Sequence, residues 1–265
     1  MMEYTRLEQV RAMRPLIHCI SNVVSANDCA NLALAVGASP VMAHAPQEAA
    51  YITTQAQATV LNLGTPVEEK WTSCMACAQA APPHPLVLDP VGVGASPWRR
   101  GWARRLLDTG AVTLLRVNAG EARGLLGLAG GGQGVDGPAA TARAEGVALA
   151  RTLAQVHRCA VLLTGEEDLI AGGGQVWRVG GGHPMMSRVT GTGCMLSVLC
   201  GVFAAVEPDG AQAALLAASY WKVCAQVAGE WAAHLGPGSF RLALLDGAGT
   251  LTPRSWAELA QVEQL

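Results

Sequence analysis

The chain is built around short, continuous runs of apolar residues, most of which end at a glycine, asparagine or proline. Continuous rather than alternating hydrophobicity is typical of strands that are buried on both faces of a sheet. Six such runs follow one another, at residues 15–20, 39–42, 59–64, 85–90, 112–118 and 159–165. The pattern predicts a largely parallel sheet.

Stretches of helical length separate these runs, at residues 25–36, 66–81, 97–109, 118–128 and 139–157. Alternating strands and helices predict an α/β fold, with a mostly parallel central sheet flanked by helices on both faces. After residue 165 the pattern changes. It predicts a hairpin over 169–179 that turns through the glycines at 172–174, and then helices over 194–206 and 210–234.

Composition favours one globular domain over residues 1–265, because 51% of the residues are hydrophobic and only 14% are charged. The glycine-rich stretch 129–137 is interpreted as a surface insertion. The formal charge is −2 and Lys and Arg form no blocks, so we expect neither nucleic acid nor a membrane as a partner. The surplus of apolar residues is consistent with an oligomer.

The eight cysteines lie in apolar segments of a chain without a secretory leader, which predicts reduced thiols and a cytoplasmic location. Cys74 and Cys77 have the C-x-x-C spacing, but no nearby histidine or second cysteine pair completes a metal site. We interpret both as packing residues. The most apolar stretch, 193–206, is shorter than the roughly 20 residues that cross a bilayer.

The segment Gly191-Thr192-Gly193-Cys194 opens a long apolar run that is predicted to be helical. Glycines just before a helix allow backbone N–H groups to converge on an anion, so the segment is a candidate phosphate cradle. A tight turn explains the glycines equally well, and a free cysteine often behaves as a small buried hydrophobe. The decision between these interpretations depends on the rest of the chain.

Polar side chains end three of the predicted strands. In open α/β sheets ligands bind at the carboxyl ends of the strands, so these side chains are predicted to meet at one edge. They are Asp89 after one strand, Arg116, Asn118 and Glu121 around the end of another, and Thr164 and Glu166 after a third.

Asp89 and Glu121 are suited to a hydrated Mg²⁺, which takes one or two carboxylates together with substrate phosphates. The alternative interpretation makes Asp89 a turn residue before a proline and Glu121 an acid that complements a helix dipole. Arg116 lies on a strand that is otherwise apolar, and unpaired burial of its charge would be costly. It predicts an anionic partner such as a phosphate or a carboxylate.

Together these features favour nucleotide-dependent phosphoryl transfer. A P-loop enzyme is excluded, because no G-x-x-x-x-G-K-[ST] segment is present and the only lysines are Lys70 and Lys222. Gly92 and Gly94 follow a strand, but no third glycine completes a dinucleotide-binding fingerprint.

The motifs IHCISNVV, GASPVMA, LNLGT, VLDPVGVGA, NAGE, TGEED, VTGTGC and GPGSF closely resemble those of the hydroxyethylthiazole kinases, in order from about residue 14 to the C-terminus. The resemblance implies a ribokinase-like fold and a homotrimer with active sites between neighbouring subunits. It also implies an ATP- and Mg²⁺-dependent kinase of thiamine biosynthesis or salvage. Its substrate would be the hydroxyethyl group of 4-methyl-5-(2-hydroxyethyl)thiazole.

The resemblance also implies a role for each matching residue. Met42 and Gly191 would contact the thiazole, Arg116 and Thr164 would bind ATP, and Asp89 and Glu121 would lie near Mg²⁺ and the phosphates, with Asn22 as a weaker substrate-side residue. Backbone amides of Gly191, Thr192, Gly193 and Cys194 would form the anion hole.

Cys194 would stand where the wider superfamily usually has an aspartate base. A thiol has an ordinary pKa of about 8.5, so it accepts the substrate proton only if its surroundings favour the thiolate. Since phosphoryl transfer depends chiefly on positioning and charge stabilisation, the alternative is that Cys194 mainly shapes the pocket. Both roles stay open at this stage.

Two other functions compete with this one. The first is another ribokinase-like activity, either a kinase for a different vitamin-sized alcohol or a nucleotide-repair dehydratase. Those relatives usually have aspartate at the position of Cys194, so the cysteine disfavours them. The second is a binding protein that has lost catalysis, which the retention of Asp89, Arg116, Glu121 and Thr164 disfavours.

Overall fold

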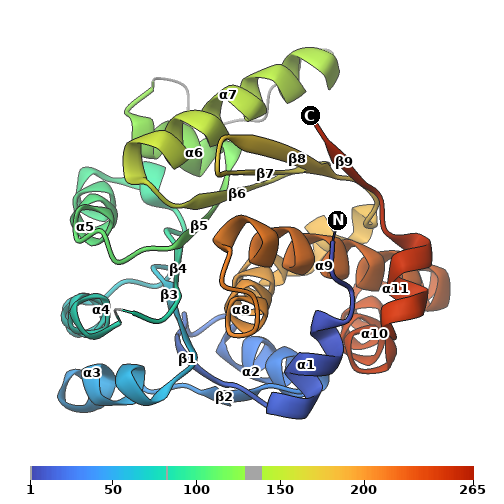
Figure 1. The fold of residues 1–265 in the computed structure, drawn as a ribbon, viewed down its shortest axis with the longest axis horizontal. Coiled ribbons are helices and arrows are strands. Elements are labelled where there is room, and N and C mark those ends of the chain that lie inside the picture. The colour runs from blue at the N-terminus through green and yellow to red at the C-terminus, as the bar shows by residue number, and fades with distance from the viewer. Residues whose placement is uncertain (1, 82, 129–138) are drawn as a thin grey trace.

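The computed structural model describes residues 2–81, 83–128 and 139–265, and contains one nine-stranded sheet (Figure 1). The first six strands in spatial order are parallel, and the last three are antiparallel to their neighbours. The order is β2 (Ser39–Val41), β1 (Leu16–Ile20), β3 (Ala58–Asn62), β4 (Leu86–Asp89), β5 (Leu114–Asn118), β6 (Ala160–Thr164), β7 (Asp168–Gly172), β8 (Gln175–Val179) and β9 (Val262–Gln264). The predicted strands and hairpin are confirmed.

Helices cover both faces of the sheet, as expected from the alternating pattern (Figure 1). One face carries α3 (Pro46–Gln55), α4 (Glu68–Ala80), α5 (Pro97–Asp108), α6 (Ala119–Leu126) and α7 (Ala139–His157). The other carries α1 (Arg6–Met13), α2 (Ala26–Val36), α8 (Thr192–Ala204), α9 (Gly210–Ala232), α10 (Pro237–Thr250) and α11 (Pro253–Leu259). Short 3-10 turns occupy Val93–Ala95, Pro184–Arg188 and Ala233–Leu235.

Each central strand divides its side chains between two hydrophobic cores. In β6, Leu162 packs in the core on the α8 side, while Val161 and Leu163 pack in the core on the opposite face. Because successive side chains of a strand point to opposite faces, burial of both faces requires an unbroken apolar run. This explains the sequence pattern from which the sheet was predicted.

The register of the sheet brings polar strand ends together. Asn62 at the end of β3 is the cross-strand partner of Asp89 at the end of β4. Asn118 at the end of β5 likewise pairs with Thr164 at the end of β6. Both polar pairs therefore lie at the carboxyl edge of the sheet.

Several elements lack a clear signal in the sequence, namely α1, α3, α10, α11 and β9. The sequence of α10 contains three glycines, which have low helix propensity, and α11 has only 7 residues. Helix α8 begins at Thr192 rather than at residue 194 as predicted. The predicted surface insertion at 129–137 lies outside the described residues. None of the helices in the described ranges combines the length and hydropathy of a membrane span.

Candidate active site

The predicted anion-binding segment is the first turn of α8. Gly191 precedes the helix in the left-handed region with φ of +84°, and Thr192, Gly193 and Cys194 are its first three residues. The first N–H groups of a helix have no acceptor within the helix. In the part of the chain that the structure describes, no side chain caps this end. The positive end of the α8 dipole is therefore available to an anion.

Glycine is required at two positions of this turn. A Cβ atom at Gly193 would lie 2.6 Å from Nη2 of Arg116, and one at Gly191 would lie 2.9 Å from Cβ of Ser25. The Arg116 guanidinium therefore packs directly against the backbone of the turn. The cradle and its cation form a single unit.

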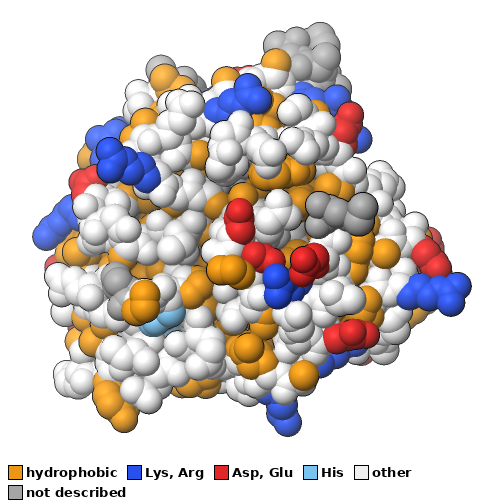
Figure 2. All heavy atoms as spheres, in the orientation of Figure 1, with side chains coloured by type: hydrophobic (Ala, Val, Ile, Leu, Met, Phe, Trp, Pro, Cys, Tyr) orange, Lys and Arg blue, Asp and Glu red, His pale blue; other side chains and the backbone are white. Residues whose placement is uncertain are grey.

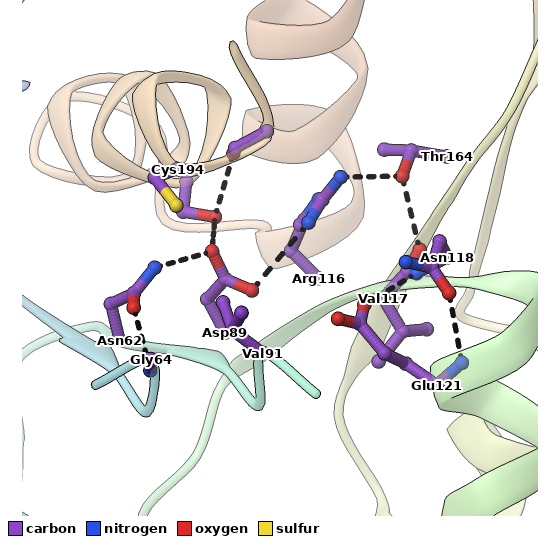
Figure 3. Close-up of polar contacts among 12 residues, drawn as sticks. Asn62, Gly64, Asp89, Val91, Arg116, Val117, Asn118, Glu121, Thr164 and Cys194 are labelled. Carbon is purple, nitrogen blue, oxygen red and sulfur yellow. Dashed lines mark hydrogen bonds and ion pairs between the residues drawn. The ribbon is translucent and has the colours of Figure 1, made fainter. Parts of the chain in front are cut away.

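Asp89 lies beneath this unit and is fully buried. Its Oδ2 accepts hydrogen bonds from Asn62 Nδ2 and from Ser197 Oγ, both at 2.8 Å. Its Oδ1 lies 3.5 Å from Arg116 Nη1 and has no hydrogen-bond partner in the described chain (Figure 3). One carboxylate oxygen is thus fixed by the protein, and the other has capacity for a ligand.

Burial raises the pKa of Asp89 to about 6, although the Arg116 guanidinium opposes this rise and the Glu121 carboxylate adds to it. At neutral pH the carboxylate is largely ionised in a water-poor setting. A free carboxylate oxygen there suits a hard cation such as Mg²⁺.

Arg116 joins β5 to β6 at their carboxyl ends. Its Nη2 donates to Thr164 Oγ1 at 2.7 Å, and that hydroxyl donates to the carbonyl of Val117 at 3.3 Å. Burial lowers the pKa of the guanidinium, but Asp89 and Glu121 outweigh burial and leave it raised. The Nε atom is buried and has no acceptor among the described residues. The predicted anionic neighbour of Arg116 is Asp89, and the Nε donor remains unused.

Glu121 holds the loop that follows β4. Its Oε1 accepts from the N–H of Gly92 at 3.1 Å, and its Oε2 accepts from the N–H of Asn118 at 2.9 Å. The Asn118 side chain accepts from the N–H of Glu121 in return, which completes a capping box. Glu121 therefore stabilises the start of α6, as the alternative interpretation expected. Its charge also acts on Asp89.

Asn22 connects the cysteine to the strand ends. Its Nδ2 donates to Cys194 Sγ at 3.2 Å and to Asn62 Oδ1 at 3.0 Å. Asn62 was not singled out from the sequence, although it ends a predicted strand and the rule that selected Asp89 applies to it. Cys194 itself is half-buried, in contrast to the other seven cysteines, which are buried.

Met42 follows β2, the strand at the far edge of the sheet, and is half-buried against the same core as Cys194. Its carbonyl is within 2.9 Å of Nδ1 of His44. Glu166, which follows β6, is exposed. The structure thus gathers Asn22, Asp89, Arg116, Thr164 and the α8 turn, and leaves Glu166 on the surface.

Two cavities open beside Thr164. One, of about 210 Å³, is lined by Arg116, Gly193 and Trp221 among others, and the second, of about 510 Å³, lies between α6 and α7 and shares Thr164 with the first. Within residues 2–81, 83–128 and 139–265, no group of three His, Cys, Asp or Glu side chains is arranged to hold a metal. A magnesium ion here therefore needs oxygen ligands from a phosphorylated substrate and water.

The model of the hydroxyethylthiazole kinase family matches residues 7–254. This chain belongs to that family. It is 43% identical to the hydroxyethylthiazole kinase of Desulforudis audaxviator and 40% identical to that of Shouchella clausii. Each alignment covers 98% of this chain, with 94% of the first relative and 100% of the second.

Solved structures agree with this membership. The hydroxyethylthiazole kinase structure from Pyrococcus horikoshii superposes with a TM-score of 0.90 at 34% identity, over 99% of this chain and 98% of that one. The pyridoxal kinase of Staphylococcus aureus in complex with pyridoxal is 15% identical, with a TM-score of 0.60 over 80% of this chain and 87% of that one. The second likeness concerns the fold alone, and with the first it confirms the ribokinase-like fold.

Proposed function

We propose that this hydroxyethylthiazole kinase family member transfers the γ-phosphoryl group of ATP to the hydroxyethyl group of 4-methyl-5-(2-hydroxyethyl)thiazole. The observation that carries the proposal is the uncapped first turn of α8, packed against Arg116 and above the buried carboxylate of Asp89. Amides and a guanidinium on one side and a carboxylate on the other suit a phosphoryl group with its metal ion.

The nucleotide is assigned to the cavities beside Thr164. Arg116 Nε and the N–H groups of Thr192, Gly193 and Cys194 supply donors for the phosphates. When bound, Mg²⁺ would neutralise charge on the transferring phosphoryl group. The free Oδ1 of Asp89 would hold it, and Glu121 would act on it through water, because amides already occupy both Glu121 oxygens.

The thiazole alcohol is assigned to the side of the turn where Asn22, Met42 and Gly191 lie. Cys194 Sγ accepts the hydrogen bond of Asn22 and lies at the start of the anion-binding turn. Two roles are distinguished here. Either the sulfur accepts the proton of the hydroxyl as the new O–P bond forms, or it forms part of the pocket wall while the proton leaves with the phosphate.

The variants Cys194→Ala and Cys194→Asp separate these two roles. If Cys194 accepts the proton, Cys194→Asp retains substantial kcat while Cys194→Ala loses roughly tenfold to hundredfold. Equal kcat for Cys194→Ala and the wild type would rule out Cys194 as an essential base. Cys194 would then serve as part of the pocket wall. The measurement is ADP release at saturating ATP and thiazole alcohol.

We further infer that the chain works as one kinase domain in a cytoplasmic homotrimer, with neighbouring subunits completing each site. The supporting features are apolar side chains that stay exposed near the site, Val23 at 85% and Val24 at 58%, and eight free thiols. In the face drawn in Figure 2, the Lys and Arg side chains lie mostly around the periphery, with apolar side chains spread between them. Sedimentation equilibrium tests the assembly: a trimer is expected, and a monomer at assay concentration would contradict it.

The reaction is tested by incubating the purified protein with ATP, Mg²⁺ and the thiazole alcohol, and by detecting the thiazole phosphate by mass spectrometry. A panel of related vitamin-precursor alcohols serves as the control for specificity. Turnover of another alcohol with none of the thiazole would overturn the substrate assignment.

A further inference from the structure

Lys70 lies in the first turn of α4, but its side chain points inward and is 6% exposed. Its ammonium donates to the carbonyl of Ser21 at 2.9 Å and to the carbonyl of Gly64 at 2.6 Å. These carbonyls belong to the loops that follow β1 and β3. In the described chain no carboxylate forms an ion pair with this lysine, so two carbonyls are its protein partners.

Such a group is costly to bury. An ammonium taken out of water without a counter-ion loses far more solvation than two carbonyl contacts return, and a packed apolar side chain of similar length is usually at least as stable. The cost is visible in the pKa of Lys70, which burial lowers to about 8. Packing of α4 therefore does not account for a lysine at this position.

Each of the two loops is linked to a residue of the candidate site through one asparagine side chain. Ser21 precedes Asn22, whose Nδ2 donates to Cys194 Sγ at 3.2 Å. Gly64 donates its N–H to Asn62 Oδ1 at 2.9 Å, and Asn62 in turn donates to Asp89 Oδ2. The same ammonium thus contacts the loop that contains Asn22 and the loop that directly follows Asn62.

The loops are also in close contact with each other. A Cβ atom at Gly64 would lie 3.1 Å from Cβ of Asn22 and 3.0 Å from Oδ1 of Asn62, which is tighter than ordinary van der Waals contact. Asn22 and Asn62 are directly hydrogen-bonded at this point. Small movements of either loop are therefore transmitted to Cys194 and to Asp89.

We propose that Lys70 is a positioning residue for phosphoryl transfer, whose ammonium ties the loop after β1 to the loop after β3 and so fixes Asn22 against Cys194 and Asn62 against Asp89. The expected kinetic effect of Lys70 rests on the proposed function. Its structural role rests only on the contacts described above. Lys70 touches no reacting atom, so its effect passes through the two asparagines.

Three variants test this role. Lys70→Met removes the charge and both donors at similar length, Lys70→Arg keeps a charged donor, and Glu68→Gln changes one charge on the exposed side of the same helical turn as a control. In Lys70→Met we expect the KM for the thiazole alcohol to rise about tenfold, since the loop that contains Asn22 loses its hydrogen bond from a charged donor. The KM for ATP stays within twofold, because Arg116 and Thr164 lie on other strands. Lys70→Arg restores part of the loss, and Glu68→Gln changes nothing.

Hydrogen–deuterium exchange gives a readout that needs no kinase activity. In Lys70→Met, amides in residues 21–25 and 62–65 exchange about tenfold faster, while those of β6 and α9 keep the wild-type rate. Unchanged exchange in both loops, or faster exchange throughout the chain with equal rises in both KM values, would overturn the proposal. If the wild type does not phosphorylate the thiazole, the proposed function fails, and the exchange experiment still decides whether Lys70 ties the loops.

Discussion

The only two lysines of the chain lie on opposite sides of the site. Each donates to two loop carbonyls, but they differ in whether a carboxylate balances their charge. On the side proposed for the nucleotide, the Lys222 ammonium donates to the carbonyls of Gly165 and Glu166 at 3.0 and 2.7 Å, and lies 3.4 Å from the buried carboxylate of Asp168. On the side proposed for the alcohol, Lys70 also binds two loop carbonyls, but no carboxylate of the described chain pairs with it. Both lysines are buried.

The difference concerns charge compensation. Lys222 and Asp168 balance each other's charge, so this ion pair needs no ligand to be satisfied. The side proposed for the alcohol retains an uncompensated cation next to the loop that contains Asn22 and the loop that follows Asn62. We conclude that Lys222 holds its loop through a balanced ion pair, and that Lys70 keeps positive charge close to the place where phosphate and thiol chemistry is proposed.

Asp89 belongs to both sides, and its loss should have the largest effect. For Asp89→Asn we expect kcat/KM to fall about 10³-fold, because a neutral amide neither binds Mg²⁺ well nor balances Arg116. The amide keeps the shape of the side chain, but the buried Arg116 loses its counter-charge, so we expect a folded variant with a lower free energy of unfolding. A fall of less than tenfold would show that this carboxylate is not central.

Gly193→Ala should damage the nucleotide side alone. The added Cβ would meet the Arg116 guanidinium at 2.6 Å, so the guanidinium or the turn has to move away from the phosphate position. We expect kcat/KM for ATP to fall about 10²-fold. Steady-state kinetics with each substrate varied in turn measures this. The KM for the thiazole alcohol at saturating ATP serves as the internal control. An equal rise in both KM values would contradict the assignment of the two substrates to separate sides of the site.

Stability should separate the two lysines. Lys222→Met leaves the Asp168 carboxylate buried without its cation, and breaking such a pair costs about 3–5 kcal/mol. Lys70→Met leaves no buried charge unpaired, so its cost is expected to be about 1 kcal/mol or less. Urea unfolding of both variants gives the two free energies side by side. Equal losses would contradict the account of charge compensation.

The smallest effect is a dependence on pH. The pKa of Asp89 in the folded chain is raised to about 6, so the protonated form is favoured by folding and the carboxylate becomes ionised as pH rises through that value. We expect kcat/KM to fall about tenfold for each pH unit below 6, as the free enzyme loses the ionised carboxylate. For stability the sign is opposite: the contribution of Asp89 is fully present below its unfolded pKa and is lost as pH rises toward 6. Circular dichroism at pH 5 checks that the protein stays folded, and a kcat/KM that is flat between pH 5 and 7 would contradict this prediction.

The sheet was predictable from sequence because burial on both faces demands continuous apolar runs, and each of the six runs became a strand. The glycine turn, Asp89, Arg116 and Thr164 were predictable because polar residues at the ends of buried strands are conspicuous. Helix α10 was not predicted, because its glycines lower the helix propensity of the segment. The helix is stabilised by packing on α9 and α2.

Lys70 was missed for a different reason. It follows Glu68 and Glu69 in a first helical turn, a context typical of an exposed lysine, and nothing local indicates that its side chain turns inward. Its burial depends on two loops that lie far from each other in the sequence. Asn62, by contrast, could have been predicted, because it is a polar residue at the end of a buried strand, as Asp89 is.

The most direct test of the central claim is product formation by the purified wild-type chain. With ATP, Mg²⁺ and 4-methyl-5-(2-hydroxyethyl)thiazole, mass spectrometry should detect the thiazole phosphate and ADP in equal amounts, and omission of Mg²⁺ should abolish both. Absence of the thiazole phosphate from folded protein under these conditions would contradict the account.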